Sequence, residues 1–277
     1  NKTKNGALGV KKDLETKVNS IASWAKNKGC RVGISTSVSV DHATPAAFYA
    51  HQGQRSSYYN VGLDLIDANF DFYAGSDFLD PTNKKAAGSN SESLYTLVDK
   101  AGYTIARGYK DYQKKAKKSD KLILLQPATA TDNSAIPYAI DRKKGDMTLT
   151  EITRAGINFL SKDLSKGFFL MVEGGKIDWA CHANDAATVF NEVKDMDNAI
   201  KVAYEFYKKH PKETLIVITA DHETGGIVLG TGKYALNLKA LQYQKHSADG
   251  LSRRISELRK SKGNKVTWED MKDCLLY

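Results

Sequence analysis

Short apolar runs typical of buried strands alternate along this chain with stretches in which apolar residues recur at helical spacing. The runs of strand type are Arg31–Ser39, Asp71–Ala74, Lys121–Gln126, Gly167–Val172 and Thr214–Ala220. The stretches with helical spacing are Leu14–Asn27, Pro45–His51, Ser57–Asn69, Ser93–Lys100, Leu149–Leu164 and Asn184–Lys209. Because strands that alternate with helices build parallel sheets, the pattern predicts an α/β fold, with a mostly parallel central sheet flanked by helices on both faces.

The character of the chain changes after Gly230. Residues 231–277 are polar, basic and helix-like, and they contain no further run of the buried-strand type. We therefore expect two parts: an α/β core over residues 1–229, which we expect to be incomplete, and the start of a polar helical insertion or accessory region over residues 230–277.

Charge and composition narrow the classes of partner. The 277 residues carry 41 Lys and Arg against 32 Asp and Glu, a formal net charge of +9. The basic residues are mixed with acidic ones in Lys110–Lys121, Arg142–Lys144 and Arg253–Lys265, which is typical of solvated helix faces, so we expect no nucleic-acid partner. A positive field still favours anionic substrates such as phosphate esters.

Neither a membrane span nor a disulfide framework is expected. The longest apolar runs are far shorter than the roughly 18–20 residues that cross a bilayer. Three cysteines, Cys30, Cys181 and Cys274, have neither metal-binding spacing nor the density of a disulfide scaffold. A pairing of Cys30 with Cys181 has no support in the sequence, and for Cys181 packing in the core is favoured over a nucleophilic role.

Acidic residues and histidines follow two of the predicted strands directly. Glu173 ends one strand, with Asp178 and His182 shortly after it, and Asp221 and His222 end another. Because the carboxyl ends of parallel strands meet at one edge of a sheet, we expect these side chains to converge there. Carboxylates and imidazoles are ligands for zinc and similar divalent ions, so the pattern indicates a metal-dependent hydrolase.

Each of these residues also has a purely structural explanation when taken alone. Asp178 would serve as a helix N-cap, His182 as a half-buried histidine with satisfied hydrogen bonds, and Asp221 as a turn residue. Two such pairs at the ends of two strands favour the metal-binding interpretation. On a helix, Asp178 and His182 would share one face because they are four residues apart.

A third polar cluster follows the first predicted strand. His42 and Thr44 offer nitrogen and oxygen ligands, and Pro45 suits the first turn of a helix. Arg55 stands among polar residues a little further on, and a guanidinium can hold two oxygens of a phosphate at once. A surface salt bridge is the competing explanation for Arg55, and it is favoured when that residue is considered alone.

Together these residues resemble the alkaline phosphatase family. The segment Val32-Gly-Ile-Ser-Thr-Ser-Val-Ser-Val-Asp-His-Ala-Thr-Pro-Ala resembles the stretch that leads to the family's third metal site. Val172-Glu-Gly-Gly-Lys-Ile-Asp-Trp-Ala-Cys-His resembles its E-G-x-x-I-D-x-x-x-H motif, and Thr219-Ala-Asp-His-Glu-Thr-Gly-Gly resembles its T-A-D-H motif. The resemblance holds in register from about Asn5 to Gly226, with the three motifs in the family's order.

The resemblance implies two zinc ions and one magnesium ion as cofactors. It assigns Asp178 and His182 to the first zinc, Asp221 and His222 to the second, and Glu173 and Thr44 to the third site. His42 also belongs to the third site, where some members of the family carry aspartate, so metal preference there is expected to differ. Arg55 resembles the arginine that binds the substrate phosphate. Trp179 stands where other members have lysine or histidine, so a second contact to phosphate is expected to be altered.

The implied activity is phosphomonoester hydrolysis through a phosphoserine intermediate. The family's nucleophilic serine precedes the matched stretch, and a last zinc-binding histidine follows the insertion, so we expect this chain by itself to be inactive and to contain no catalytic nucleophile. The resemblance further implies small phosphate monoesters as substrates, a homodimer for the full-length protein, and a periplasmic or secreted location.

Two alternative functions remain open from the sequence. One is another enzyme of the same superfamily, such as a phosphodiesterase, a sulfatase or a metal-dependent mutase. The other is a fragment that binds metal and phosphate without turnover.

Overall fold

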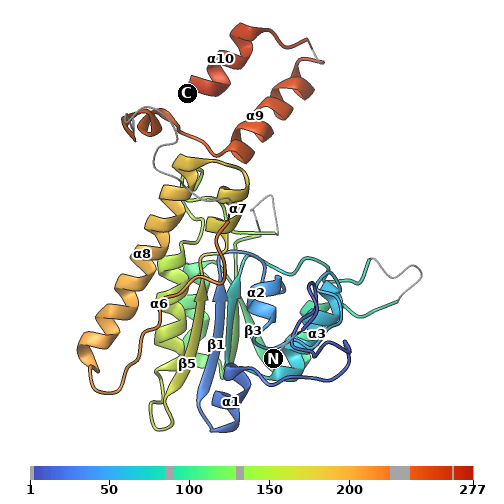
Figure 1. The fold of residues 1–277 in the computed structure, drawn as a ribbon, viewed down its shortest axis with the longest axis vertical. Coiled ribbons are helices and arrows are strands. Elements are labelled where there is room, and N and C mark those ends of the chain that lie inside the picture. The colour runs from blue at the N-terminus through green and yellow to red at the C-terminus, as the bar shows by residue number, and fades with distance from the viewer. Residues whose placement is uncertain (1–2, 85–89, 129–133, 225–237, 264, 277) are drawn as a thin grey trace.

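The computed structural model describes residues 3–84, 90–128, 134–224, 238–263 and 265–276. Within these residues five strands form one sheet in the order β3-β4-β2-β1-β5, and each neighbouring pair is parallel. The strands are β1 (Arg31–Thr36), β2 (Phe72–Gly75), β3 (Tyr103–Arg107), β4 (Lys121–Leu125) and β5 (Phe168–Glu173). Helices lie on both sides of this sheet (Figure 1), so the predicted α/β fold is confirmed.

Alternating side chains of the strands build a separate apolar core on each face of the sheet. In β4, Ile123 and Leu125 belong to one buried cluster, whereas Leu122 and Leu124 belong to the other. The first cluster is covered by α1 (Ile21–Asn27), α2 (Ala43–Ala46), α3 (Tyr58–Ala68) and α4 (Leu94–Lys100). The second is covered by α5 (Tyr109–Lys115), α6 (Leu149–Leu160) and α8 (Ala186–Lys209). Burial on both faces explains why the β4 sequence is a continuous apolar run.

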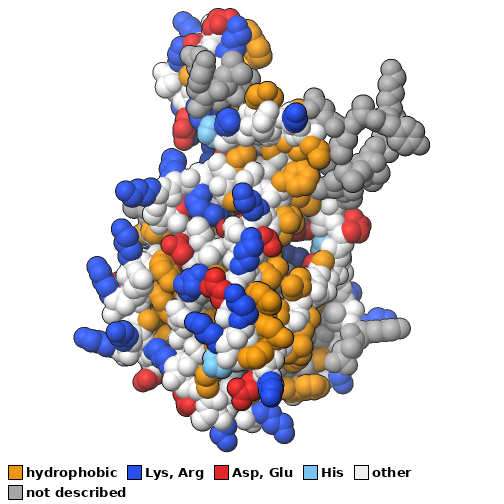
Figure 2. All heavy atoms as spheres, turned by 90° about the vertical axis from the view of Figure 1, so that its left-hand side faces the viewer, with side chains coloured by type: hydrophobic (Ala, Val, Ile, Leu, Met, Phe, Trp, Pro, Cys, Tyr) orange, Lys and Arg blue, Asp and Glu red, His pale blue; other side chains and the backbone are white. Residues whose placement is uncertain are grey.

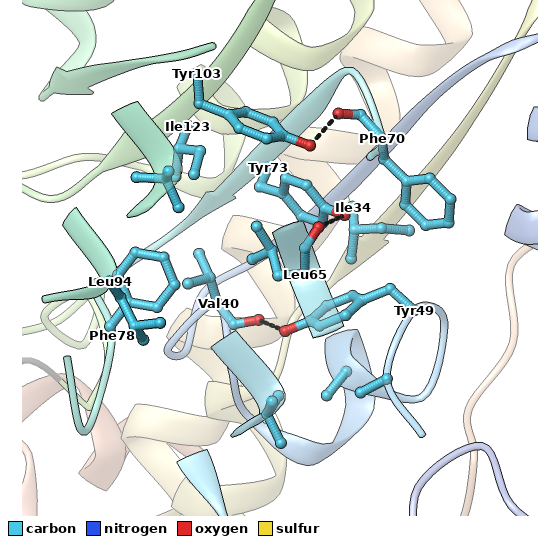
Figure 3. Close-up of a cluster of buried hydrophobic side chains, with 14 of the residues drawn as sticks. Ile34, Val40, Tyr49, Leu65, Phe70, Tyr73, Phe78, Leu94, Tyr103 and Ile123 are labelled. Atoms are coloured by element: carbon cyan, nitrogen blue, oxygen red, sulfur yellow. Dashed lines mark hydrogen bonds between the residues drawn. The ribbon is translucent and has the colours of Figure 1, made fainter. Parts of the chain in front are cut away.

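Buried tyrosines on the first face satisfy their hydroxyls with backbone carbonyls (Figure 3). Tyr49 donates to the carbonyl of Val40 at 2.7 Å, and Tyr103 donates to that of Phe70 at 2.8 Å. A buried hydroxyl without a partner would oppose folding, so these bonds allow large rings to fill this core. The bond from Tyr49 also fixes the chain between the end of β1 and α2, where the third polar cluster lies.

Several boundaries differ from the expectation. The first helix begins at Ile21 rather than Leu14, because Leu14 has a φ of 66° and the Ser20 side chain caps the helix at its true start. The helix expected from Pro45 to His51 is the short α2, which ends at Ala46. Strand β3 was not predicted, because as an edge strand it is only partly buried and lacks a continuous apolar run.

The expected strand Thr214–Ala220 is wrong. These residues form no regular element, and Leu215, Val217 and Ile218 are 87%, 72% and 64% exposed. Figure 1 shows this stretch returning from the far end of α8 toward α7 (Lys176–His182). A strand needs a partner for its backbone as well as an apolar sequence, and within the described residues β5 forms an edge of the sheet without pairing to this stretch.

The described residues after 237 are helical, as expected. They form the 3-10 helix η2 (Leu238–Tyr243), α9 (Ala248–Ser261) and α10 (Trp268–Leu276), which lie beyond one end of the sheet in Figure 1. Two carboxylates hold the start of α9: Asp141 accepts the backbone N–H of Ser247 at 3.0 Å, and Asp185 accepts that of Ala248 at 2.7 Å. The boundary near residue 230 lies outside the described residues and stays a prediction.

Basic side chains are dispersed over the face of the molecule in Figure 2, among acidic and hydrophobic ones. Arg142 departs from the expected solvated position, because its guanidinium forms a two-point ion pair with the carboxylate of Asp195 on α8, at 3.2 and 2.8 Å. Both side chains are largely buried. No described helix is both long enough and apolar enough to cross a membrane.

Gly75, at the end of β2, packs closely against the backbone of Val38, in the segment that follows β1. A Cβ atom there would lie 2.7 Å from the carbonyl oxygen of Val38, which accepts the backbone N–H of Ser76. We predict that Gly75→Ala lowers the free energy of unfolding by about 1–3 kcal/mol in urea denaturation, because the backbone must shift.

The matched control is Gly53→Ala, whose added Cβ would meet Leu14 at an ordinary 3.4 Å. Equal urea midpoints for the two variants would contradict the close approach at Gly75.

Candidate metal and phosphate site

The parallel register of β1 and β5 brings the first two polar clusters together. Thr36, the last residue of β1, lies opposite Glu173, the last residue of β5. Its hydroxyl donates to the Glu173 carboxylate at 2.5 Å. Gly175 follows closely, and a Cβ there would lie 3.0 Å from a Glu173 oxygen, so the glycine leaves room for this carboxylate. Thr36 was not identified from the sequence, since a threonine within a strand carries no signal of its own.

Asp178 and His182 lie on one face of α7, as predicted from their spacing. The Nε2 atom of His182 is 3.5 Å from the Oδ1 atom of Asp178, and both side chains are accessible to solvent. Asp178 lies inside the helix, which begins at Lys176, so the N-cap explanation for Asp178 does not hold.

His222 reaches the same place although the stretch before it is not a strand. Its Nε2 atom lies 4.0 Å from Asp178 Oδ1 and 3.6 Å from Asp221 Oδ2. Thr224 also contacts Asp178, donating its hydroxyl to Oδ1 at 2.7 Å. Asp178 is thus the carboxylate on which the two predicted pairs converge. Thr224 was missed, although it stands only two residues after His222.

Glu173 faces an excess of negative charge. Removal from water raises the pKa of its carboxyl, the hydroxyls of Thr36 and Thr44 lower it, and the charges of Asp221 and Asp178 raise it further. Carboxylates that repel one another in this way are stabilised when a cation lies between them. The hydroxyl of Thr44 is among the groups that act on Glu173, and the assignment of both residues to one metal site stays a prediction.

His42 lies at the junction of the clusters with an unsatisfied ring nitrogen. Its Nδ1 atom is buried and has no hydrogen-bond partner, while its Nε2 atom is 3.5 Å from Nη2 of Arg55. Burial lowers the pKa of His42 to about 4, with Arg55 contributing in the same direction and Asp178 in the opposite one. The ring is therefore neutral at pH 7, the form that binds a metal.

Arg55 is exposed, and within the described part of the chain no carboxylate forms an ion pair with it. The salt-bridge explanation for Arg55 thus finds no support in these residues. Its backbone N–H donates to the carbonyl of Gly6 at 2.7 Å, which fixes the loop while the guanidinium stays open to an anion.

The donor set fits divalent cations. Ligand atoms of one tetrahedral zinc ion lie roughly 3.3 Å apart, given zinc–nitrogen bonds of about 2.0–2.1 Å, and the 3.5 Å between His182 and Asp178 is close to this value. The buried, unpaired Nδ1 of His42 is a further nitrogen donor. In the residues described, no three His, Cys, Asp or Glu side chains are already grouped tightly enough to hold an ion.

The cysteines take no part in this donor set among the described side chains. Cys30 and Cys181 are free thiols, and Cys30 donates to the carbonyl of Lys166. Cys181 packs against the apolar cluster of Tyr138, Ala180 and Val189, as expected from the sequence. The side chain of Cys274 lies outside the described set.

The segments that follow β1 and β5 bring carboxylates and imidazoles together, with an exposed arginine beside His42, and this arrangement on an α/β sheet defines a candidate metallohydrolase. A family model described as "Alkaline phosphatase" matches residues 1–68 and 76–272. The chain belongs to the alkaline phosphatase family.

Curated relatives and solved structures agree with this family. Alkaline phosphatase 4 of Bacillus subtilis is 33% identical over 279 residues, covering 98% of this chain and 58% of that protein. The tissue-nonspecific alkaline phosphatase of Mus musculus is 31% identical over 242 residues, covering 74% of this chain and 44% of that protein. The chain thus spans about half the length of the curated relatives it matches.

Among solved structures, the cold-active alkaline phosphatase of Shewanella sp. superposes with a TM-score of 0.77 at 29% identity, covering 98% of this chain and 65% of that one. The enzyme of the Antarctic bacterium TAB5 gives a TM-score of 0.65 at 34% identity, over 76% of this chain and 58% of that one. A histidine-to-glutamate mutant of the TAB5 enzyme has been solved with Mg bound in a site called M3.

The burial of Glu173, together with the nearby charges of Asp221 and Asp178, predicts a pH-dependent effect of removing its carboxyl group. Because the pKa of Glu173 is raised in the folded chain, its ionisation opposes folding, and this cost appears as pH rises through and above the ordinary value of 4.5. We predict that Glu173→Gln stabilises the metal-free chain in EDTA, and that the gain in the free energy of unfolding grows as pH rises from about 4.5 through the raised pKa of Glu173 and is constant at higher pH.

Glu213→Gln, at an exposed position, serves as the control and should show a flat difference over the same range. A pH-independent or negative effect at Glu173 would contradict a raised pKa of its carboxyl group in the folded chain.

Proposed function

We propose that this chain supplies the metal- and phosphate-binding part of a phosphomonoester hydrolase. The observation that carries the proposal is the convergence of His182, His222 and Thr224 on the carboxylate of Asp178. Membership of the alkaline phosphatase family supports phosphate monoesters as the substrate class. The chain spans only part of its relatives, so the activity of the whole protein is part of this proposal.

The proposed ligands fall into three groups, following the family resemblance. Two zinc ions are assigned to Asp178 with His182 and to Asp221 with His222, and a magnesium ion is assigned to Glu173, Thr44 and His42. Bound divalent ions would supply charge neutralisation and activation of the nucleophile and water. Glu173 and His42 both lie near enough to Asp178 to be affected by its charge, and Arg55 approaches His42 at 3.5 Å, which supports placing these groups around one substrate phosphate.

The chain's own residues then bind and orient the substrate. Arg55 presents a guanidinium that can donate two hydrogen bonds to a phosphate, and its Nη2 atom lies 3.5 Å from Nε2 of His42, beside the proposed third metal site. Trp179 sets its ring edge-to-face with His42, with 5.8 Å between ring centroids, and so shields that side of the imidazole from water.

For the isolated chain we propose binding without turnover. Three serines close to the cluster, Ser35, Ser37 and Ser39, are buried, with exposures of 0–1%. Buried hydroxyls offer no nucleophile to an incoming ester, and the family's phosphoserine chemistry is therefore assigned to a serine outside the described site.

Another superfamily activity, on diesters or sulfate esters, remains the alternative. Export from the cytoplasm and dimerisation of the longer protein stay predictions from the family resemblance. Comparing rates on a phosphate monoester and a diester with the longer protein would separate the two enzyme classes.

Zinc binding tests the donor set directly. We predict that Asp178→Asn weakens zinc binding by more than about a hundredfold, since loss of a direct ligand should exceed the loss of an outer-shell partner. The double variant Asp221→Ala, His222→Ala should lower the zinc stoichiometry after dialysis.

The matched control is Asp197→Asn on α8, which removes an exposed carboxylate that also has a partner four positions on, Lys201 at 2.7 Å. Zinc affinity of the Asp178 variant equal to that of the Asp197 variant would remove Asp178 from the ligand set.

Phosphate binding tests Arg55. We predict that Arg55→Ala weakens the binding of inorganic phosphate to the zinc-loaded chain by about 1.5–3 kcal/mol, the contribution of hydrogen bonds to a charged group. Arg55→Lys should give an intermediate affinity, because lysine keeps the charge but loses the paired donors.

Calorimetry of Arg154→Ala provides the control, because Arg154 is half-exposed on α6 and pairs with Glu205 at 3.6 Å. Equal phosphate affinity for the Arg55 and Arg154 variants would exclude Arg55 from the site.

A further inference from the structure

Lys176 begins α7 and is buried, with only 5% of its surface exposed. Its ammonium lies over two aromatic rings, 3.3 Å from the ring centroid of Tyr138 and 4.9 Å from that of Trp179. A cation removed from water is stabilised by the faces of aromatic rings, and this attraction strengthens as the site becomes drier. The lysine therefore holds Trp179 from one side.

The two rings around Lys176, those of Tyr138 and Trp179, form an aromatic cage, and a residue of α8 fixes the Tyr138 side of this cage. Glu192 accepts the backbone N–H of Ala139 at 2.6 Å, next to Tyr138. Burial raises the pKa of Glu192, while that N–H group and the charges of Arg142 and Lys176 lower it. The Glu192 side chain thus fixes the Tyr138 segment, and the charge of Lys176 is near enough to favour the ionised form of Glu192.

Trp179 contacts both Lys176 and the candidate site. Its ring meets the ring of His42 edge-to-face, at 5.8 Å and 65°. His42 in turn lies 3.5 Å from the guanidinium of Arg55. Asp178 lies between Lys176 and Trp179 in the sequence of α7. Contacts that fix these two side chains therefore also fix the position of the helix that carries Asp178.

We propose that Lys176 is a positioning residue: its caged ammonium fixes Trp179 against His42 and thereby orders the Arg55 side of the site. The expected effect of Lys176 on phosphate binding rests on the proposed function, whereas its effect on the positions of the Trp179 and His42 rings does not. No contact between Lys176 and the substrate is invoked.

Nuclear magnetic resonance of the metal-free chain tests the placement. In the parent, the Hε protons of Lys176 should lie far upfield of the ordinary lysine position, because they face the ring of Tyr138. Lys176→Met should shift the indole N–H of Trp179 and the ring protons of His42, whereas Lys176→Arg should largely restore them. The control is Lys208→Met, which removes an exposed lysine that lies 5.5 Å from the Tyr204 ring centroid on α8 and should leave both signals unchanged.

Ordinary Hε shifts for Lys176 in the parent would overturn the proposal even if the methionine variant failed to fold. Unchanged Trp179 and His42 signals in a folded Lys176→Met variant would overturn it as well.

A second readout connects the placement to phosphate. In the zinc-loaded chain, Lys176→Met should lower the affinity for inorganic phosphate by roughly three- to tenfold, and Lys176→Arg should restore most of that affinity. Unchanged phosphate affinity in the methionine variant would overturn the link to Arg55. No phosphate binding by the parent would count against the proposed function, and the resonance shifts would then decide the placement of Trp179 by themselves.

Discussion

The pairing of β1 with β5 is the constraint on which the site depends. Their parallel register ends with Thr36 opposite Glu173, so the segments that leave the two strands start side by side. One segment carries His42 and Thr44, and the other carries Asp178 and His182. A register shift of one residue would send Glu173 to the opposite face of the sheet and separate the carboxylate from the threonines that hydrogen-bond to it. The two apolar cores, which fix each strand from both faces, therefore also fix the chemistry.

Two buried polar groups of the candidate site lower the stability of the metal-free chain. Glu173 is raised in pKa by burial and by neighbouring carboxylates, and His42 keeps a buried nitrogen without a partner. A buried carboxylate near other carboxylates and a buried nitrogen without a hydrogen bond both oppose folding, unless a cation binds them. Binding of a metal would then stabilise the folded chain by mass action, which couples the stability of the strand ends to their proposed function.

The sequence predicted the parts of the fold in which local pattern and burial agree. The apolar run of β4 was identified because it is buried almost along its whole length, and α8 was identified because part of one face packs against the core. The stretch Thr214–Ala220 has an equally apolar pattern, yet pairing depends on a partner strand that the pattern does not show. The candidate site residues were predicted from the spacing of chemical groups and from the family resemblance, which explains why Asp178 and His182 were proposed whereas Thr36 was not. The role of Lys176 could not be predicted, since its burial comes from Tyr138 on a distant segment.

X-ray absorption at the zinc edge of the zinc-loaded chain tests most directly whether these strand ends hold a metal. We predict a first shell of nitrogen and oxygen atoms at about 2.0–2.1 Å, with the outer scattering of imidazole rings, and a weaker imidazole scattering together with less bound zinc in the Asp221→Ala, His222→Ala variant. A shell of sulfur at about 2.3 Å would place the metal on cysteine and contradict the account, as would a shell of water oxygens alone.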